Sequence, residues 1–111
     1  MKNILTAFLI ITLPAFSATA ASFDCRQSRS ADEKAICSSH SLNDLDVEMS
    51  VKYQFLHGLY AMGAAGELHD SQVLWLAERR QCGGDTTCLT KAYKQRLKTL
   101  NHLYDAINKP L

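Results

Sequence analysis

Four cysteines constrain the fold of this 111-residue chain more than any other feature of its sequence. An even number of cysteines in a short exported chain is typical of a disulfide framework, and four cysteines allow three pairings. The spacings favour the local pairing, in which Cys25 bonds to Cys37 and Cys82 bonds to Cys88. Loop-closure entropy then predicts that the two disulfides stabilise the fold by about 3 and about 2.5 kcal/mol.

Zinc binding and catalysis are two other uses of cysteine. Structural zinc sites usually contain cysteine pairs separated by two to four residues. Here eleven residues separate Cys25 from Cys37, and five separate Cys82 from Cys88. A catalytic cysteine needs a free thiol near a base, and the thiols of exported proteins tend to be oxidised. We therefore expect two disulfides, and neither a metal nor another cofactor.

The start of the chain has the features of a secretory signal peptide. Lys2 supplies a positive charge, residues 4–16 are mostly apolar, and Ala-Thr-Ala at residues 18–20 matches the small residues that precede a signal peptidase site. The apolar run is shorter than the roughly 20 residues that a membrane span requires. Export also explains why the cysteines are expected to be oxidised.

Two processing sites are compatible with this leader. We expect cleavage after Ala20, with cleavage after Ala21 as the alternative. Residues 1–20 would then be removed, and residues 21–111 would form one helical domain. Cys25 lacks the small apolar lead-in that lipid attachment needs. The sequence thus predicts a periplasmic or secreted protein with no stable membrane anchor.

Acidic and basic residues are balanced, since the chain has 12 Lys and Arg residues and 11 Asp and Glu residues. A balanced chain has no electrostatic reason to bind nucleic acid or an anionic membrane surface. Lys91, Lys94 and Lys98 form a mild basic strip, which is more typical of a solvated helix face than of a binding patch. We expect a protein as the partner and no nucleic acid.

Apolar residues recur at gaps of three and four residues, which predicts helices rather than strands. The expected helices cover residues 31–38, about 42–60, about 67–81 and about 87–108. Short connections between long helices favour antiparallel neighbours. The predicted fold class is all-α: an antiparallel three-helix bundle plus a short N-terminal helix, stapled by two disulfides.

Residues with capping preferences mark the expected helix ends. Ser30 and Glu33 fit a capping box before the first helix, and Ser41 is expected to cap the second helix. Gly63 and Gly66 are expected to end the second helix, which leaves residues 62–70 as the longest uncovered connection.

The segment QCGGDTTC is expected to form a stapled turn between the last two helices. Gly83 and Gly84 can adopt positive φ after a helix end. Asp85, Thr86 or Thr87 can then cap the helix that follows.

One group of polar and aromatic residues predicts a structural contact across the bundle. Trp75 and Arg79 share a helix face with Cys82, because their spacing is i, i+4 and i+7. Tyr93 and Arg96 lie three residues apart on the last helix. We expect Asp46 to pair with Arg79 or Arg96, partly buried, with Trp75 packed nearby. Such a pair would set the helix register more than it would add stability.

Other titratable residues do not form a pattern typical of catalysis. Asp44, Asp46 and Glu48 lie within one or two turns of a helix and point in different directions, so they do not form a catalytic carboxylate pair. No two histidines have the i, i+4 spacing of a helical metal site, and the sequence has neither a nucleophile elbow nor a phosphate loop. We therefore expect that the protein is not an enzyme.

Three motifs of the chain resemble one known family. They are E-K-x-I-C at residues 33–37, W-L-x-x-R-x-x-C at residues 75–82 and C-L-x-x-x-Y-x-x-R at residues 88–96. Together they resemble the LprI-type lysozyme-inhibitor family of small exported bacterial proteins, from Phe23 to about Leu100. The resemblance implies an all-helical, disulfide-held domain of the cell envelope. The lipid-attachment cysteine of the family's namesake is missing here, so the resemblance implies no membrane anchor.

Two functions are compatible with this resemblance. The first is inhibition of a lysozyme by a rigid scaffold that occludes the active-site cleft, with no oligomeric state implied. The expected contact is the connection at residues 62–70, and its candidate residues are Gly63, Gly66, Glu67, His69 and Asp70. The stapled turn at residues 82–88 is the second candidate surface. The alternative function is an envelope binding, immunity or assembly partner without lysozyme activity.

Overall fold

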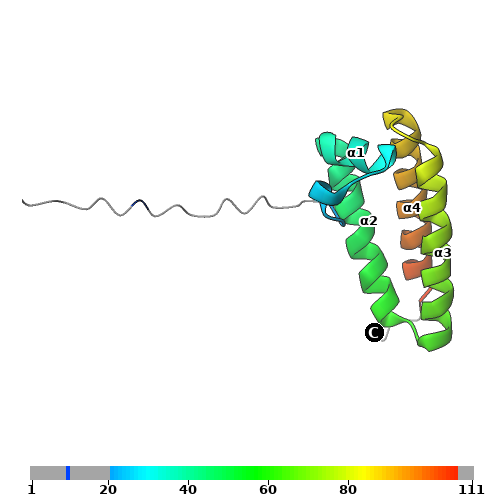
Figure 1. The fold of residues 1–111 in the computed structure, drawn as a ribbon. Helices are drawn as coiled ribbons and strands as arrows, with labels where there is room; N and C mark the ends of the chain where they lie inside the picture. The colour runs from blue at the N-terminus through cyan, green and yellow to red at the C-terminus, as the bar shows by residue number, and fades with distance from the viewer. Residues whose placement is uncertain (1–9, 11–20, 108–111) are drawn as a thin grey trace, which may run out of the picture.

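A computed structural model describes Ile10 and residues 21–107, and this part of the chain is helical (Figure 1). A short 3-10 helix, η1, precedes four α-helices. Their bounds are η1 Cys25–Gln27, α1 Ala31–Ser38, α2 His40–Leu59, α3 Met62–Gln81 and α4 Thr86–Asp105. No strand occurs in the described part. Apart from Ile10, the expected signal peptide lies outside the described residues, and so do residues 108–111.

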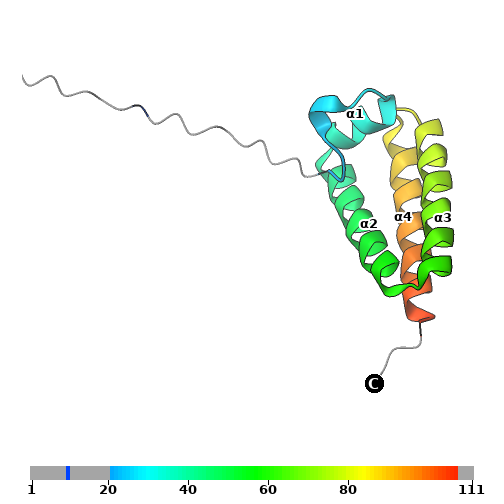
Figure 2. The ribbon, with the colours of Figure 1, turned by 60° about the horizontal axis from the view of Figure 1, so that its bottom comes forward.

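The three long helices form an antiparallel bundle, and α1 lies across one end of it. Helices α2 and α4 run in the same direction and α3 runs opposite to both, as Figures 1 and 2 show. The closest packing is between α2 and α4, while α1 contacts both α2 and α3. The predicted fold class is therefore confirmed.

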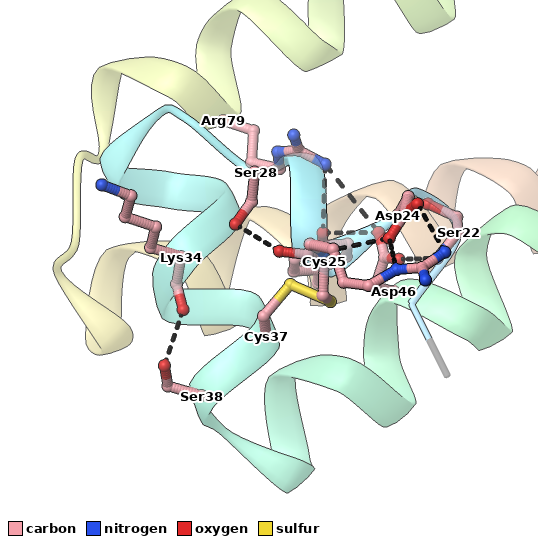
Figure 3. Close-up of a disulfide and its surroundings, with 11 residues drawn as sticks. Ser22, Asp24, Cys25, Ser28, Lys34, Cys37, Ser38, Asp46 and Arg79 are labelled. Carbon is pink, nitrogen blue, oxygen red and sulfur yellow. Dashed lines mark hydrogen bonds and ion pairs between the residues drawn. A yellow bond between two sulfur atoms is a disulfide. The ribbon is translucent and has the colours of Figure 1, made fainter. Parts of the chain in front are cut away.

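Both predicted disulfides are present. The S–S bond of Cys25 and Cys37 joins η1 to α1, as Figure 3 shows. The bond of Cys82 and Cys88 closes the turn between α3 and α4. Within that turn, Gly83 alone has a positive φ, of 56°, so the expectation for Gly84 is wrong. The carboxylate of Asp85 caps α4 by accepting a hydrogen bond from the N–H of Cys88 at 3.1 Å.

The starts of α1 and α2 differ from the expected caps. Ser39, not Ser41, is the N-cap of α2, because its hydroxyl accepts a hydrogen bond from the N–H of Leu42 at 3.3 Å. Ser41 lies inside the first turn, with its hydroxyl 3.1 Å from that of Ser39. Ser30 is the N-cap of α1, but its side chain makes no capping hydrogen bond, so the expected capping box is not formed.

The largest error of the sequence-based prediction concerns the start of α3. This helix begins at Met62, so residues 62–70 are helical and not a loop. Each glycine in a helix costs about 1 kcal/mol relative to alanine. Ala65 and Leu68 are buried, and burying a leucine side chain contributes about 2 kcal/mol. Tertiary burial thus offsets a weak local helix propensity.

A single hydrophobic core joins all four α-helices. Its buried side chains are Ile36, Leu42, Met49, Leu56, Leu68, Trp75, Leu89, Tyr93, Leu97 and Leu100. Most of these residues have the three-and-four spacing that predicted the helices. Four charged residues are also buried, and three of them, Asp32, Asp46 and Arg79, belong to the candidate site.

Candidate functional site

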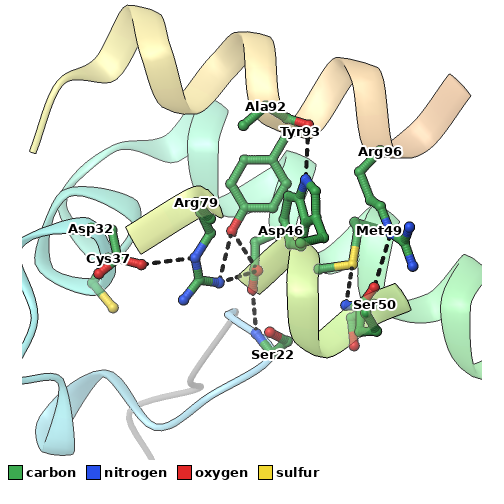
Figure 4. A network of polar contacts seen from close by, with 12 residues as sticks. Ser22, Asp32, Cys37, Asp46, Met49, Ser50, Arg79, Ala92, Tyr93 and Arg96 are labelled. Carbon is green, nitrogen blue, oxygen red and sulfur yellow. Dashed lines mark hydrogen bonds and ion pairs between the residues drawn. The ribbon is translucent and has the colours of Figure 1, made fainter. Parts of the chain in front are cut away.

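A buried polar network lies where the four α-helices meet. Each helix contributes one side chain: Asp32 from α1, Asp46 from α2, Arg79 from α3 and Tyr93 from α4 (Figure 4). Both carboxylates are fully buried, and Arg79 is 4 % exposed. The network therefore links every α-helix of the domain through charged or hydroxyl groups.

Arg79 is the centre of this network. Its Nε donates a hydrogen bond to Asp32 Oδ2 at 2.9 Å, which is also the closest ion pair of the site. Its Nη1 donates to the Tyr93 hydroxyl at 3.3 Å and lies 3.8 Å from Asp46 Oδ1. One guanidinium thus interacts with two carboxylates that come from different helices.

Asp46 accepts hydrogen bonds from two sides. The Tyr93 hydroxyl donates to Oδ1 at 2.7 Å, and the backbone N–H of Ser22 donates to Oδ2 at 2.6 Å. The second bond attaches the segment before η1 to the middle of the bundle. Asp46 is therefore held by the N-terminal segment as well as by α4.

Aromatic rings surround the guanidinium of Arg79. Its Cζ lies 5.6 Å from the centre of the Phe23 ring and 6.0 Å from that of Trp75. The Trp75 ring packs edge-on against Tyr93 at 5.1 Å, and its indole N–H donates to the carbonyl of Ala92 at 3.2 Å. The rings keep water from the cation and add cation–π attraction.

These surroundings shift the pKa values of the network. Burial alone would raise the pKa of Asp32. The Ser30 hydroxyl, the Arg79 guanidinium and the backbone N–H of Glu33 outweigh burial and lower the pKa below its usual value. Burial and the charge of Asp46 raise the pKa of Tyr93 far above its usual value. Burial opposes the charge of Arg79, but Tyr93 and Asp32 outweigh it and raise the pKa. Because the pKa of Tyr93 is raised, its side chain stays a neutral hydroxyl.

A second buried arginine has only neutral partners. Arg96 Nε donates to Gln72 Oε1 at 3.0 Å, and Nη2 donates to the Ser71 hydroxyl at 3.0 Å. The amide of Gln72 in turn donates to Met49 Sδ at 3.1 Å. Burial lowers the pKa of Arg96, because no carboxylate within hydrogen-bonding distance offsets the loss of solvent.

The structure confirms the predicted pairing of Asp46 with Arg79, one of its two candidate partners, but Asp46 is fully buried and not partly buried as expected. Asp46 lies within ion-pair distance of Arg79, and Trp75 packs beside that arginine. The hydrogen-bonded carboxylate of Arg79 is Asp32, which the sequence-based reasoning missed. Arg96 forms its own network instead of binding Asp46. An acidic residue in the first turn of a helix is usually assigned to the helix dipole, so the sequence carried no signal for Asp32.

The network has the chemistry of a structural element. Its carboxylates are fully buried, and their hydrogen bonds go to Arg79, to Tyr93 and to the backbone N–H of Ser22. A general acid or base must instead reach a substrate within hydrogen-bonding distance. Among the described residues, no group of three or more His, Cys, Asp or Glu side chains could hold a metal ion.

The residues expected to contact a partner lie on the first turns of α3. Gly63, Gly66, Glu67, His69 and Asp70 are exposed. The imidazole Nδ1 of His69 lies 3.5 Å from Asp70 Oδ1, which is a weak and solvent-exposed contact. These residues are accessible, but they form a helix surface and not a loop that could insert into a cleft.

A basic groove lies between the N-terminal ends of α2 and α4. Lys91, Lys94 and Lys98 line it, together with the hydroxyl groups of Ser39 and Ser41 and of three threonines of α4. Within residues 21–107, none of the three lysines forms an ion pair with an acidic side chain. The groove is therefore free to receive an anionic group.

An apolar surface follows the outer face of α2. Val51, Phe55 and Leu59 are 60 %, 58 % and 49 % exposed, and their i, i+4, i+8 spacing places them in one row. The ring of Phe55 lies 6.0 Å from that of Tyr104 on α4. This row is a second surface that a partner protein could cover.

Within the described residues, no helix is long and apolar enough to span a membrane. Comparison with known proteins found no matching family model, no significantly similar curated protein and no significantly similar solved structure. The site is therefore interpreted from its geometry and from the sequence motifs alone.

Proposed function

We propose that this chain is an exported, non-catalytic binding protein, and that its partner is a lysozyme whose active-site cleft it occludes. The motif resemblance suggests the class of partner. The observation that supports a contact surface is the basic groove beside α4, which is lined by Lys91, Lys94 and Lys98.

The cleft of a lysozyme-type glycosidase supplies the matching charge. Its catalysis depends on two carboxyl groups that flank the scissile bond. Lysine ammonium groups on a stiff helix can approach such carboxylates without ordering a loop, which reduces the entropy cost of binding. This surface replaces residues 62–70 as the proposed contact, because Glu67 and Asp70 are exposed there and their charge does not complement the carboxyl groups of a cleft.

The disulfides and the buried network support a scaffold role. The bond between Cys82 and Cys88 closes the turn immediately before Lys91 on α4. Arg79 and Tyr93 tie α3 and α4 to the rest of the bundle. The lysines thus project from a helix whose position is set by both covalent and buried polar contacts.

Residual lysozyme activity in the presence of excess protein tests the proposal directly. Chicken-type, goose-type and invertebrate-type enzymes should be compared, and we expect at least one to be strongly inhibited. The triple variant Lys91→Gln, Lys94→Gln and Lys98→Gln should raise the inhibition constant by about tenfold or more, because the matching charges are lost. Lys34→Gln on α1 is the matched control and should change nothing. Full activity of all three enzymes would refute the proposal.

The exposed row on α2 favours a second candidate function, binding to another envelope protein. Replacing Phe55 by Asp would place a charge in the middle of that row. Under this alternative, Phe55→Asp abolishes capture of one defined partner from envelope extract, while lysozyme remains unaffected by either form. If the variant and the unmodified chain retain the same proteins, the alternative is wrong.

A further inference from the structure

The network around Arg79 has an incomplete charge balance. Asp32 and Asp46 are fully buried, and the guanidinium of Arg79 is the one cation that contacts them within the described residues. Tyr93 is held neutral, so two buried carboxyl groups share one cation. Removing a carboxylate from water without a compensating cation costs several kcal/mol. A further positive group is therefore expected beside this cluster.

The neighbouring arginines do not supply this charge. Arg96 donates its hydrogen bonds to Gln72 and Ser71. Arg26 pairs with the partly buried carboxylate of Asp24 at 3.2 Å. Arg80 lines a pocket beside Ser22 and Arg79, but within the described residues it forms no ion pair with Asp32 or Asp46.

The N-terminal segment reaches the cluster directly. The backbone nitrogen of Ser22 lies 2.6 Å from Asp46 Oδ2, and Figure 4 shows Ser22 turned toward that carboxylate. Ala21 is buried, with 9 % of its surface exposed. Covalent geometry places the nitrogen of Ala21 about 3 Å from that of Ser22. The predicted processing site thus lies next to a buried carboxylate.

We propose that Asp46 is a buried acceptor site for the α-ammonium group that signal-peptide cleavage creates. A signal peptidase adds water across the bond between Ala20 and Ala21, which leaves a carboxylate on Ala20 and an ammonium group on Ala21. The new ammonium supplies the missing positive charge. Cleavage after Ala21 would have the same consequence, because the nitrogen of Ser22 would then itself be the ammonium group.

Processing and stability are then coupled. Before cleavage, an uncharged peptide nitrogen occupies this position, and Asp46 shares its one cation with Asp32. After cleavage, the ammonium group and Asp46 form an ion pair in a site from which water is largely excluded. The domain therefore reaches its full stability after export, in the compartment where its disulfides form.

The first test compares two forms of the oxidised chain. One begins at Ala21, and the other carries the natural residues 18–20 before it, which moves the ammonium group away from Asp46. We expect the extension to raise the equilibrium constant of unfolding in urea by about tenfold or more. In an Asp46→Asn background the two forms should be equally stable. An Asp24→Asn background, which removes a partly buried carboxylate of the same segment, should leave the difference unchanged.

Two results of this test would overturn the proposal. One is equal stability of the two forms with Asp46 present. The other is a difference that persists after Asp46→Asn. Each result would mean that the ammonium group does not interact with that carboxylate.

A second measurement needs no variant and covers the case in which Asp46→Asn does not fold. An amine-acylating reagent at neutral pH labels a free α-amine faster than a lysine. The reason is that the usual pKa of an α-amine is near 8, which is lower than that of a lysine. In the folded chain that begins at Ala21, the α-amine should instead be labelled at least about tenfold more slowly than in urea. Mass spectrometry of the N-terminal peptide measures this ratio, and equal labelling rates would contradict the proposal.

The pH dependence of stability gives an independent check. The charged or titratable groups that face the site are Asp32 and Glu33 from α1, Asp46 from α2, Arg79 and Arg80 from α3 and Tyr93 from α4. An ion-paired α-amine has a raised pKa when folded, so its contribution is complete below pH 8 and is lost as the pH rises through the folded pKa. The chain that begins at Ala21 should lose this advantage over the extended form in mildly alkaline buffer, and a constant difference would contradict the assignment.

The exported protein itself provides the last check. N-terminal peptide mapping of protein recovered from the producing cell should find Ala21 or Ser22 as the first residue. A mature chain that begins further upstream would exclude the proposed ion pair.

Discussion

Two buried arginines of this domain occupy contrasting surroundings. Arg79 is bound by Asp32, lies near Asp46 and packs against aromatic rings. Arg96 is buried to nearly the same degree, at 6 % exposure, but its hydrogen-bond partners are an amide and a hydroxyl. The pKa of Arg79 is raised and that of Arg96 is lowered.

The comparison separates the roles of charge and of hydrogen bonding. Carboxylates offset the burial cost of Arg79 and make it the point at which all four α-helices are joined. Neutral acceptors satisfy the hydrogen-bond donors of Arg96, but they do not offset the cost of burying its positive charge. We therefore expect the loss of Arg79 to cost more stability than the loss of Arg96, because it would leave two buried carboxyl groups without a cation, whereas Arg96 links α4 to α3 through neutral groups.

Replacement of Arg79 should have the largest effect. Arg79→Met leaves two buried carboxylates without their cation, which we expect to lower the free energy of unfolding by about 4 kcal/mol. Arg96→Met, the matched control, removes hydrogen bonds to neutral groups and should cost about 1 kcal/mol. Urea unfolding of both variants measures the contrast. Equal losses of unfolding free energy in the two variants would show that an arginine buried beside carboxylates contributes no more than one buried beside neutral groups.

Removal of the first disulfide should have the next largest effect. The double variant Cys25→Ser and Cys37→Ser should lower stability by about 3 kcal/mol through chain entropy alone. The same bond positions the N-terminal segment beside the Arg79 network, so this change should be non-additive with Arg79→Met and additive with Arg96→Met. A thermodynamic cycle of unfolding free energies checks this. If the disulfide variant is additive with Arg79→Met as well as with Arg96→Met, the disulfide and the Arg79 network are energetically independent.

A smaller effect is expected at the hydroxyl that joins Arg79 to Asp46. Tyr93→Phe removes the donor to Asp46 and the acceptor for Arg79, which should cost about 2 kcal/mol. The phenyl ring keeps its packing against Trp75, so the circular dichroism spectrum should be unchanged. A loss of unfolding free energy as large as that of Arg79→Met would instead indicate a packing defect.

The smallest expected effect is a pH dependence that belongs to the Arg79 region alone. The folded pKa of Asp32 is depressed, so its stabilisation is complete above the usual pKa near 4 and is lost as the pH falls through the folded value. Unfolding measured between pH 2 and pH 5, a window of about three units, should show a shallower slope for Asp32→Asn. Arg96→Met should keep the pH slope of the unmodified chain. A shallower slope in Arg96→Met would contradict the separation of the two regions.

Several elements could be predicted from local sequence patterns. The spacing of the cysteines predicted both disulfides, and the recurring apolar residues of α2 and α4 predicted an all-α bundle. Asp85 was among the expected caps of α4 and fills that role. These features depend on neighbours within about a dozen residues, and short-range chemistry therefore determines them.

Other elements required contacts between distant segments. The start of α3 at Met62 was missed because Gly63 and Gly66 are weak helix formers, and only burial of Leu68 in the assembled core outweighs them. The contact of Ser22 with Asp46 was missed because a backbone N–H has no sequence signature.

The amino-acid sequence by itself determined the helical class and the disulfide pairing of this protein, because periodicity and thiol spacing act over short distances. Only the tertiary structure decided which charges are joined. Asp32 and Asp46 come from separate helices, and both meet Arg79 only after the bundle has assembled. The strength of a charge contact depends on burial and separation, and neither quantity exists until distant parts of the chain pack together.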